Sequence, residues 1–359
     1  VLFRSWKDDK TWFGQYAGAY IQSTLAGMTP ENAHIIARNT ADTGRLIPGT
    51  PGFKAAFDQV IADPSVLSGS KLVDNSRIYH SDANYNFKDL IKFAEIQVGG
   101  SYRLYELNSH GRIYTDANGP INYNEYGAYT QLTKRFLEDR LKFTGSVRYD
   151  KSKNFDGNFS PRVSLVYSGG ETKKHNFRAS FQTGFRNPST QDQYIGFNVG
   201  SAILLGSAPD NLSRYTETLP VSTAIGQAFA GGTSVVMTGL NAYNNSYTAS
   251  SVSAFSALAA SDPIAGSALL RKTTVDYVKP EQVKAFELGY RSFINDVSVD
   301  VNGYYNVYND FIGNLNVIAP LYGTAQNSPN PLGGPSDAGA QSLHALQNGN
   351  YRVYQLYTN

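Results

Sequence analysis

The chain contains long stretches in which apolar and polar residues alternate. From Leu141 to Asp150 the odd positions carry Leu, Phe, Gly, Val and Tyr, and the even positions carry Lys, Thr, Ser, Arg and Asp. A period of two places successive side chains on opposite faces of an extended strand. This stretch is therefore predicted to be a strand with one apolar face and one polar face.

The same alternation recurs over most of the chain after residue 75, and several of the stretches are 11 or more residues long. It predicts strands near residues 76–87, 93–107, 124–136, 141–151, 160–168, 175–187, 283–293, 297–312 and 351–359. Residues 1–6 resemble the remnant of an earlier strand. The expected fold class is therefore all-β.

The links between these predicted strands alternate between short and long without exception. Short links lie at 88–92, 137–140, 169–174 and 294–296, and long links lie at 108–123, 152–159, 188–282 and 313–350. An antiparallel up-and-down sheet has this layout when one rim carries tight turns and the other carries long loops, as in outer-membrane barrels. The pattern predicts part of a transmembrane β-barrel.

A soluble sandwich, in which the apolar faces pack on a second sheet, is the competing architecture. The strands here are longer than the five to six residues or so that are usual in globular sheets. Aromatic residues also gather toward strand ends, as in an interfacial girdle. Side chains predicted to face lipid are Phe143, Val147, Phe181, Leu288 and Val299, and those predicted to face the lumen are Arg148, Arg178, Arg186 and Asp300.

Residues 11–75 read differently, because Trp12, Tyr16 and Tyr20 recur at helical spacing. The pairs Thr29-Pro30 and Thr50-Pro51 are typical of helix starts. This stretch is predicted to be a small helical insertion on the extracellular side. The segments 188–282 and 313–350 are predicted to be long extracellular loops. A structureless loop as long as 188–282 is uncommon, so this segment is either an elaborated surface loop or contains a hairpin, for example near 233–238.

Composition narrows the classes of function. The chain has 31 basic and 29 acidic residues and a formal net charge of +2, which gives no case for nucleic-acid binding. It has no Cys, so disulfides, thiolate metal sites and a cysteine nucleophile are excluded for these residues. No apolar run reaches the length of a transmembrane helix, but barrel strands need only about 9–11 alternating residues.

Enzyme signatures are weak. The five histidines are isolated from one another, and neither a HExxH motif, a G-x-S-x-G elbow nor a P-loop occurs. Residues 150–157 lack the spaced ligands of a calcium loop, so a polar hairpin loop is the better interpretation. We therefore expect no enzyme activity, no metal site and no cofactor.

Residues 145–190 resemble the C-terminal barrel of TonB-dependent outer-membrane receptors. The resemblance is carried in order by Arg148-Tyr149-Asp150, Ser160-Pro161-Arg162 and Gly184-Phe185-Arg186-Asn187-Pro188. A second block agrees, from Glu287-Leu288-Gly289-Tyr290-Arg291 to Tyr308-Asn309-Asp310. Together the blocks cover roughly residues 76–312. The sequence is similar in character to receptors of Bacteroidetes-type bacteria.

The resemblance implies a 22-stranded barrel closed around an N-terminal plug, with transport driven through the TonB protein. It implies structural or plug-facing roles for the motif residues. These are Arg148, Tyr149, Asp150, Pro161, Arg162, Gly184, Phe185, Arg186, Asn187 and Pro188. No ligand-contacting residue can be singled out.

The chain is interpreted as a piece of a longer protein, since it starts at Val1 without Met and stops at Asn359 inside a predicted strand. Residues 1–359 are then expected to be a partial barrel domain without the plug.

Two functions follow as hypotheses. The first is an outer-membrane receptor that takes up a scarce nutrient, such as a siderophore, cofactor, glycan or peptide. Its expected partners are outer-membrane lipid, its own plug, TonB through the plug, and a small nutrient ligand. The alternative is a non-transporting adhesin or scaffold whose large surface loops bind partners. An encoded plug segment distinguishes the two.

Overall fold

The structure is a computed structural model that describes residues 9–63, 73–294 and 296–359. The chain divides into two compact units, residues 1–73 and residues 74–359. The predicted strand remnant at residues 1–6 lies outside the described residues. Each unit is described by itself.

The first unit is helical, as predicted. It contains α1 (Asp9–Leu25), α2 (Pro30–Ala41) and α3 (Pro51–Ala62). Thr29 and Thr50 cap α2 and α3 by accepting backbone N–H groups of the first turn, and each helix begins with Pro. Proline suits this position because its missing N–H would be unpaired there in any case. That this unit lies on the extracellular side remains a prediction.

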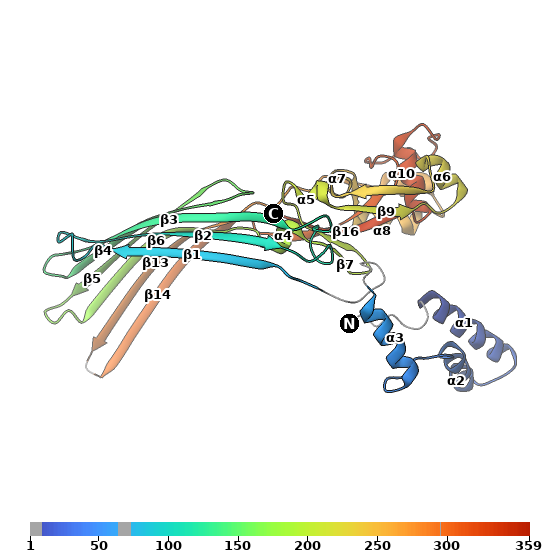
Figure 1. The fold of residues 1–359 in the computed structure, drawn as a ribbon, viewed down its shortest axis with the longest axis horizontal. Coiled ribbons are helices and arrows are strands. Elements are labelled where there is room, and N and C mark those ends of the chain that lie inside the picture. Colours follow the sequence, from blue (N-terminus) through green and yellow to red (C-terminus); the bar gives the residue numbers. More distant parts are fainter. Residues whose placement is uncertain (1–8, 64–72, 295) are drawn as a thin grey trace. The chain divides into compact units, whose positions relative to one another are not determined.

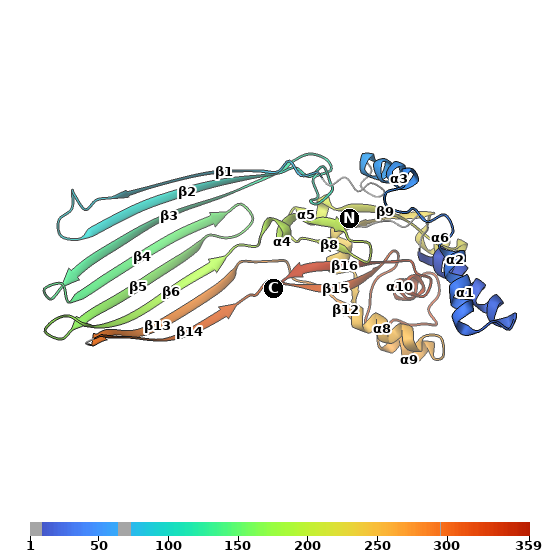
Figure 2. The same ribbon diagram turned by 90° about the horizontal axis from the view of Figure 1, so that it is seen from below.

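An eight-stranded antiparallel sheet dominates the second unit (Figures 1 and 2). Its spatial order is also its chain order, which confirms the up-and-down meander. The short links after β1, β3 and β5 lie at the same end of the sheet, as Figure 2 shows. The strands are β1 (Arg77–Asn86), β2 (Glu95–Leu107), β3 (Ile121–Phe136), β4 (Leu141–Ser152), β5 (Asn158–Gly169), β6 (His175–Arg186), β13 (Glu281–Ile294) and β14 (Val297–Asn309).

The register separates apolar from polar side chains across this sheet. Phe143 pairs with Leu165, which pairs with Ala179, so one face is apolar along neighbouring strands. Arg148 pairs with Ser160, and both lie on the opposite face. No described residue outside the sheet covers the apolar face in the region of Leu288, whose side chain is 69% exposed. Such a face needs an apolar environment, and lipid is the one expected for a barrel wall.

Residues 187–280 and 310–359 are not open loops, and we refer to them together as the loop domain. A two-stranded hairpin of β9 (Thr216–Pro220) and β10 (Ser234–Thr238) confirms the alternative near 233–238. A six-stranded sheet has the order β12-β11-β15-β16-β8-β7. Its strands are β7 (Gly196–Asn198), β8 (Ile203–Leu205), β11 (Ser246–Thr248), β12 (Lys272–Thr273), β15 (Gly313–Pro320) and β16 (Tyr351–Thr358).

Short helices complete the loop domain. They are α4 (Thr190–Tyr194), α5 (Asn211–Arg214), α6 (Ala224–Ala230), α7 (Gly239–Asn244), α8 (Ala249–Leu258), α9 (Pro263–Ala268) and α10 (Ala338–Gln347). The segments 188–282 and 313–350, predicted to be long extracellular loops, thus contain helices and strands, and their extracellular position stays a prediction. Strands from both segments pair in the six-stranded sheet, so the two segments fold together as one domain.

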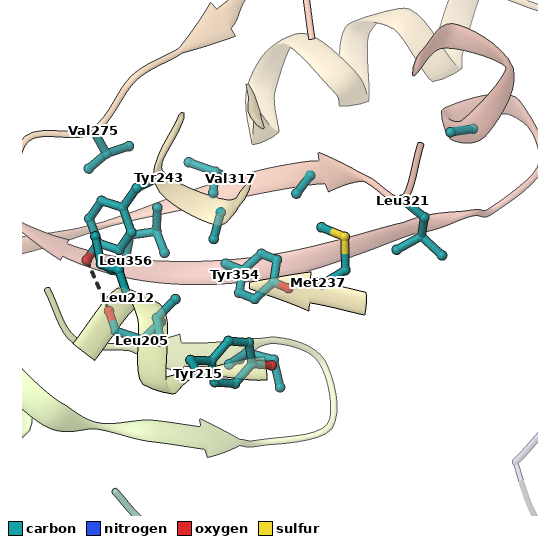
Figure 3. Close-up of a cluster of buried hydrophobic side chains, with 14 of the residues drawn as sticks. Leu205, Leu212, Tyr215, Met237, Tyr243, Val275, Val317, Leu321, Tyr354 and Leu356 are labelled. Atoms are coloured by element: carbon teal, nitrogen blue, oxygen red, sulfur yellow. Dashed lines mark hydrogen bonds between the residues drawn. The ribbon is translucent and has the colours of Figure 1, made fainter. Parts of the chain in front are cut away.

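The largest hydrophobic core lies inside this loop domain and not in the long sheet (Figure 3). Tyr243 and Tyr354 are fully buried there, together with Leu205 and Leu356. The Tyr243 hydroxyl donates to the Leu205 carbonyl at 3.2 Å and lies 2.8 Å from the Tyr357 carbonyl. A domain with its own buried core can hold a defined shape beside the sheet.

Two details of the strand prediction are corrected. The strand predicted at 297–312 ends at Asn309, because Asp310 adopts a left-handed conformation with φ 58° and the chain then joins the other sheet as β15. The strand predicted at 351–359 does not belong to the long sheet. Instead β16 lies between β15 and β8, and the long sheet ends at β14.

Candidate functional site

A polar cavity of about 620 Å³ lies where the polar face of the long sheet meets the start of the loop domain. Strands β2 to β6 supply most of its walls, and the residues after β6 close one side. Its lining combines basic, acidic, hydroxyl and aromatic side chains. They include Arg103, Tyr105, Tyr123, Glu125, Arg148, Asp150, Lys151, Ser160, Asn187 and Thr190.

Arg148 and Asp150 form a rigid pair on one wall of the cavity. Arg148 Nε donates to Asp150 Oδ2 at 2.7 Å, and Nη2 donates to Oδ1 at 2.6 Å. Nη2 also reaches Ser101 Oγ on β2 at 3.1 Å, passing over Gly127 of β3. The two-point geometry orients the guanidinium and neutralises its charge within the wall.

Glu125 joins the sheet to the loop domain. Its Oε2 accepts from the Tyr105 hydroxyl at 3.3 Å and lies 3.6 Å from Arg103 Nη1. Its Oε1 accepts from Asn187 Nδ2 at 3.0 Å. Asn187 directly follows β6, so this carboxylate holds the first residue of the loop domain against β2 and β3.

Aromatic rings form the next layer of this wall. Tyr105 and Tyr123 stack with ring centroids 4.5 Å apart, and Tyr123 lies 5.5 Å from Tyr194 of α4. Tyr194 in turn receives a hydrogen bond from Asn154 Nδ2 at 2.7 Å. These contacts connect β2, β3, the 153–157 loop and α4, so the cavity wall is a packed surface.

A second clamp lies at the rim, where the chain enters and leaves the loop domain. Arg186 donates to Glu281 through Nε and Nη2, both at 2.8 Å. Glu281 Oε1 also accepts the backbone N–H of Ile312 at 2.8 Å. One carboxylate therefore holds the ends of β6 and β13 and the residue just before β15.

The cavity brings together some of the residues that the sequence motif singled out. Those that line it are Arg148, Asp150, Gly184, Phe185, Asn187 and Pro188. Arg186 lies in the rim clamp. Tyr149 and Pro161 lie on the apolar face, where the Tyr149 ring packs 4.8 Å from Phe159. Arg162 lies on the polar face of β5 without lining the cavity.

Sequence reasoning missed Tyr105, Tyr123 and Glu125 as cavity residues. The alternation of apolar and polar residues could have placed them, since Tyr105, Tyr123 and Glu125 lie on the same face of the sheet as Arg103. The alternation shows on which face of the sheet a residue lies, but it does not show which residues along each strand lie next to the loop domain. Which residues lie there depends on the register between several neighbouring strands.

Metal-binding and membrane-spanning helices were also sought. In the described part of the chain, no group of three or more His, Asp or Glu side chains is placed to hold a metal ion. No described helix is long and apolar enough to cross a membrane. The cavity offers hydrogen bonds, paired charges and ring faces, which suit the non-covalent binding of a polar ligand.

Comparison with known proteins assigns the family. The family model described as TonB dependent receptor-like, beta-barrel matches residues 4–354. A search of curated proteins found no match.

Several solved structures are similar in part. The siderophore receptor PirA from Pseudomonas aeruginosa is 13% identical, with a TM-score of 0.42, over 80% of this chain and 38% of that one. A mutant of the ferric enterobactin receptor PfeA from the same organism is 12% identical, with a TM-score of 0.41, over 79% of this chain and 31% of that one. The chain thus spans well under half the length of these structures. The match to the family model over nearly the whole chain shows that it belongs to the TonB-dependent receptor-like β-barrel family.

Proposed function

We propose that this chain forms part of the barrel wall and the surface domain of an outer-membrane receptor that takes up a scarce nutrient. The observation that carries the proposal is the polar cavity between the sheet and the loop domain, in a chain of this family. The nutrient is a siderophore, a cofactor, a glycan or a peptide.

The construction of the cavity supports a binding role. Its volume of about 620 Å³ is in the usual range for small-ligand sites, which runs from about 300 to 1,000 Å³. Internal ion pairs hold its charged walls, so little reorganisation is needed when a ligand enters. The loop domain has a buried core, which keeps the mouth of the site in a defined shape.

The proposed partners follow from family membership. Receptors of this family lie in the outer membrane of Gram-negative bacteria, carry a plug domain inside the barrel and draw energy through TonB. We propose the same arrangement here, with lipid against the apolar face of the long sheet. The plug then lies against the polar face.

Uptake by the full-length receptor tests the proposal. A strain that lacks the gene is supplied with single siderophores, cobalamin, glycans or peptides as the limiting source of iron, cofactor or carbon. We expect one class of nutrient to support growth only when the gene is restored, and only while TonB is present. Equal growth with and without the gene on every class would contradict the proposal.

A non-transporting scaffold is the second candidate, and the size of the loop domain favours it. Two hydrophobic clusters give this domain a core, which would let it present a surface of defined shape to a protein partner. The parent gene separates the candidates. A transporter requires a plug and a TonB-contacting segment, and their absence from the gene would leave the scaffold function in place.

A further inference from the structure

Lys134 is a charged residue on the apolar face of the long sheet. It lies near the end of β3, and its register partner on β4 is Phe143, one of the residues predicted to face lipid. Two positions farther along β3, Phe136 lies on the same face and pairs with Leu141. The ion pairs of the wall lie on the opposite, polar face, so this lysine requires a separate explanation.

Two phenyl rings hold the ammonium group of Lys134. Its Nζ atom lies 5.5 Å from the centroid of the Phe93 ring and 5.5 Å from that of the Phe136 ring. In the described part of the chain no other cation lies over two rings, and Lys134 makes neither an ion pair nor a side-chain hydrogen bond there. The rings attract the cation and orient it, while its three N–H donors remain unused.

The surface around this ammonium is apolar and exposed. Phe93 and Phe136 are 64% and 42% exposed, and Leu90 and Leu137 of the links after β1 and β3 are 69% and 64% exposed. Both links lie at the same end of the sheet (Figure 2). In outer-membrane barrels the short turns are periplasmic, and aromatic residues mark the level of the lipid headgroups. An anionic headgroup at that level complements the charge of the lysine.

A hollow suited to an apolar chain begins beside this lysine. It has a volume of about 570 Å³, and its lining includes Leu141, Leu165, Tyr167, Phe177, Leu288 and Gly303. Leu141 is the register partner of Phe136, so the hollow starts on the strand next to the ammonium. Gly303 helps to keep it open, because a Cβ atom there would have no neighbour within 4 Å.

We propose that Lys134 and this hollow form a binding site for one glycerophospholipid of the periplasmic leaflet. The ammonium binds the phosphate of the headgroup, and an acyl chain lies in the hollow. The inference rests on the proposed function, which places the apolar face of the sheet against lipid, and it adds a defined site to that face. The hollow continues the lipid-facing surface, which favours a lipid phosphate over a soluble one.

Lys284 provides the matched control. Its register partners are Thr183 and Val307, which place it on the same face as Lys134. It is exposed and lies three residues after the start of β13, at the end of the sheet that borders the loop domain. No cation–π contact of Lys284 occurs among the described residues. It therefore presents a positive charge on the lipid-facing surface without the two rings.

The test measures lipid binding to the full-length receptor in detergent by native mass spectrometry. The probes are dioleoyl phosphatidylglycerol, dioleoylglycerol, which has the same chains without a phosphate, and inorganic phosphate. The variants are Lys134→Gln, Lys134→Arg, Phe93→Leu and Lys284→Gln. Heat-modifiable migration shows whether the barrel has formed in each of them.

We expect the wild type to bind phosphatidylglycerol more tightly than dioleoylglycerol. K134Q should raise the Kd for phosphatidylglycerol about fivefold, as expected for the loss of one cation beside a lipid headgroup, and leave dioleoylglycerol binding unchanged. K134R should retain binding because it keeps the charge and the ring contacts, and F93L should be intermediate. K284Q should match the wild type. Equal weakening by K134Q and K284Q would overturn the proposal, since any cation on this surface would then serve.

A photoreactive phospholipid locates the acyl chain without the need for a variant. Phosphatidylglycerol with a diazirine in one chain should label wild-type peptides that contain Leu141, Leu165 or Leu288. Labelling spread evenly over the outer face would overturn the proposal. Full competition by millimolar inorganic phosphate would also overturn it, because Lys134 would then bind a soluble anion. A receptor that binds the lipid at Lys134 but takes up no nutrient would support this site and count against the proposed function alone.

Discussion

Three glycines of the long sheet make room for long side chains of the neighbouring strand. A Cβ atom at Gly99 would overlap the Tyr129 ring, one at Gly127 would overlap the Arg148–Asp150 pair, and one at Gly289 would overlap Arg178. All three lie on the polar face. Glycine is needed there because the charged and aromatic groups of the wall lie flat across the next strand.

Replacing Gly127 by Ala should therefore disturb the cavity wall. The added methyl group displaces Asp150 Oδ1 and Arg148 Nη2, and overpacking of this kind costs about 1–3 kcal/mol. We expect a lower melting temperature for the full-length receptor in detergent. Gly303→Ala is the control, because a Cβ atom there would have no neighbour within 4 Å. Equal melting of the two variants would contradict the packing account.

His344 predicts a pH dependence for the loop domain. Burial lowers the pKa of His344 below its ordinary value of 6.5. Its Nδ1 lies 2.8 Å from the Tyr322 hydroxyl, which also accepts from Asn350 Nδ2 at 3.2 Å. That hydroxyl therefore has its hydrogen free to donate to a neutral ring. The Phe229 ring packs against His344, with 4.4 Å between the ring centroids, and contributes to this burial.

The sign follows from linkage. Below pH 6.5 the unfolded chain binds a proton at this histidine more readily than the folded domain does, so stability falls as the pH drops. We expect hydrogen exchange in α10 of the full-length receptor to speed up from pH 7.5 to 5.5, after correction for the chemical exchange rate. His344→Gln should flatten this trend. Protection that increases toward pH 5.5 in the wild type would rule the mechanism out.

At the scale of elements, the register between paired strands places charged side chains of distant segments next to one another. Arg186 and Glu281 are register partners on β6 and β13, although 95 positions separate them in the sequence. The same carboxylate holds Ile312 through its backbone N–H. The loop domain is therefore tied to the sheet at the points where the chain enters and leaves it.

Breaking this clamp should loosen the loop domain while leaving the sheet intact. Arg186 is half exposed, so we expect Arg186→Ala to cost only about 1 kcal/mol, and Glu281→Ala to cost more because it also frees Ile312 N. Limited proteolysis of the full-length receptor should show faster cleavage near residues 187–190 and 310–313. Arg214→Ala, which removes a surface pair with Asp210, should change little. Cleavage equal to that of this control in both variants would show that the clamp has no such role.

At the scale of the whole molecule, the second unit combines a sheet without a core of its own and a domain that has one. Among the described residues, β1 and β14 each have a neighbouring strand on one side only, and the apolar face of the sheet is uncovered. Unpaired backbone groups at strand edges promote association with other chains and are not tolerated in lipid.

The 359-residue chain, produced alone, is therefore expected to aggregate and not to insert as a monomeric pore. The open edges of β1 and β14 should pair with edges of other copies. Size-exclusion chromatography in detergent, followed by thermal unfolding, measures this. A monodisperse monomer with a cooperative melt would show that the edges are protected in some other way.

The sequence by itself determined the strands of the long sheet, their two faces and their meander order. These features depend on the alternation of apolar and polar residues, which has a period of two, and on the lengths of the links. Both can be read from neighbouring positions in the sequence. The caps at Thr29 and Thr50 were predictable for the same reason, since a helix start is a matter of a few adjacent residues.

Only the tertiary structure decided the fold of the loop domain and the composition of the cavity. Arg352 binds Glu217 through two hydrogen bonds of 3.0 and 2.9 Å, yet the two residues are 135 positions apart. Asn187 reaches Glu125 across 62 positions. Such contacts have no periodic signature, because they depend on where several chain crossings come together in space. For the same reason the motif could name Arg148 and Asp150 as neighbours in sequence, while only the structure showed that they pair with each other and line the cavity.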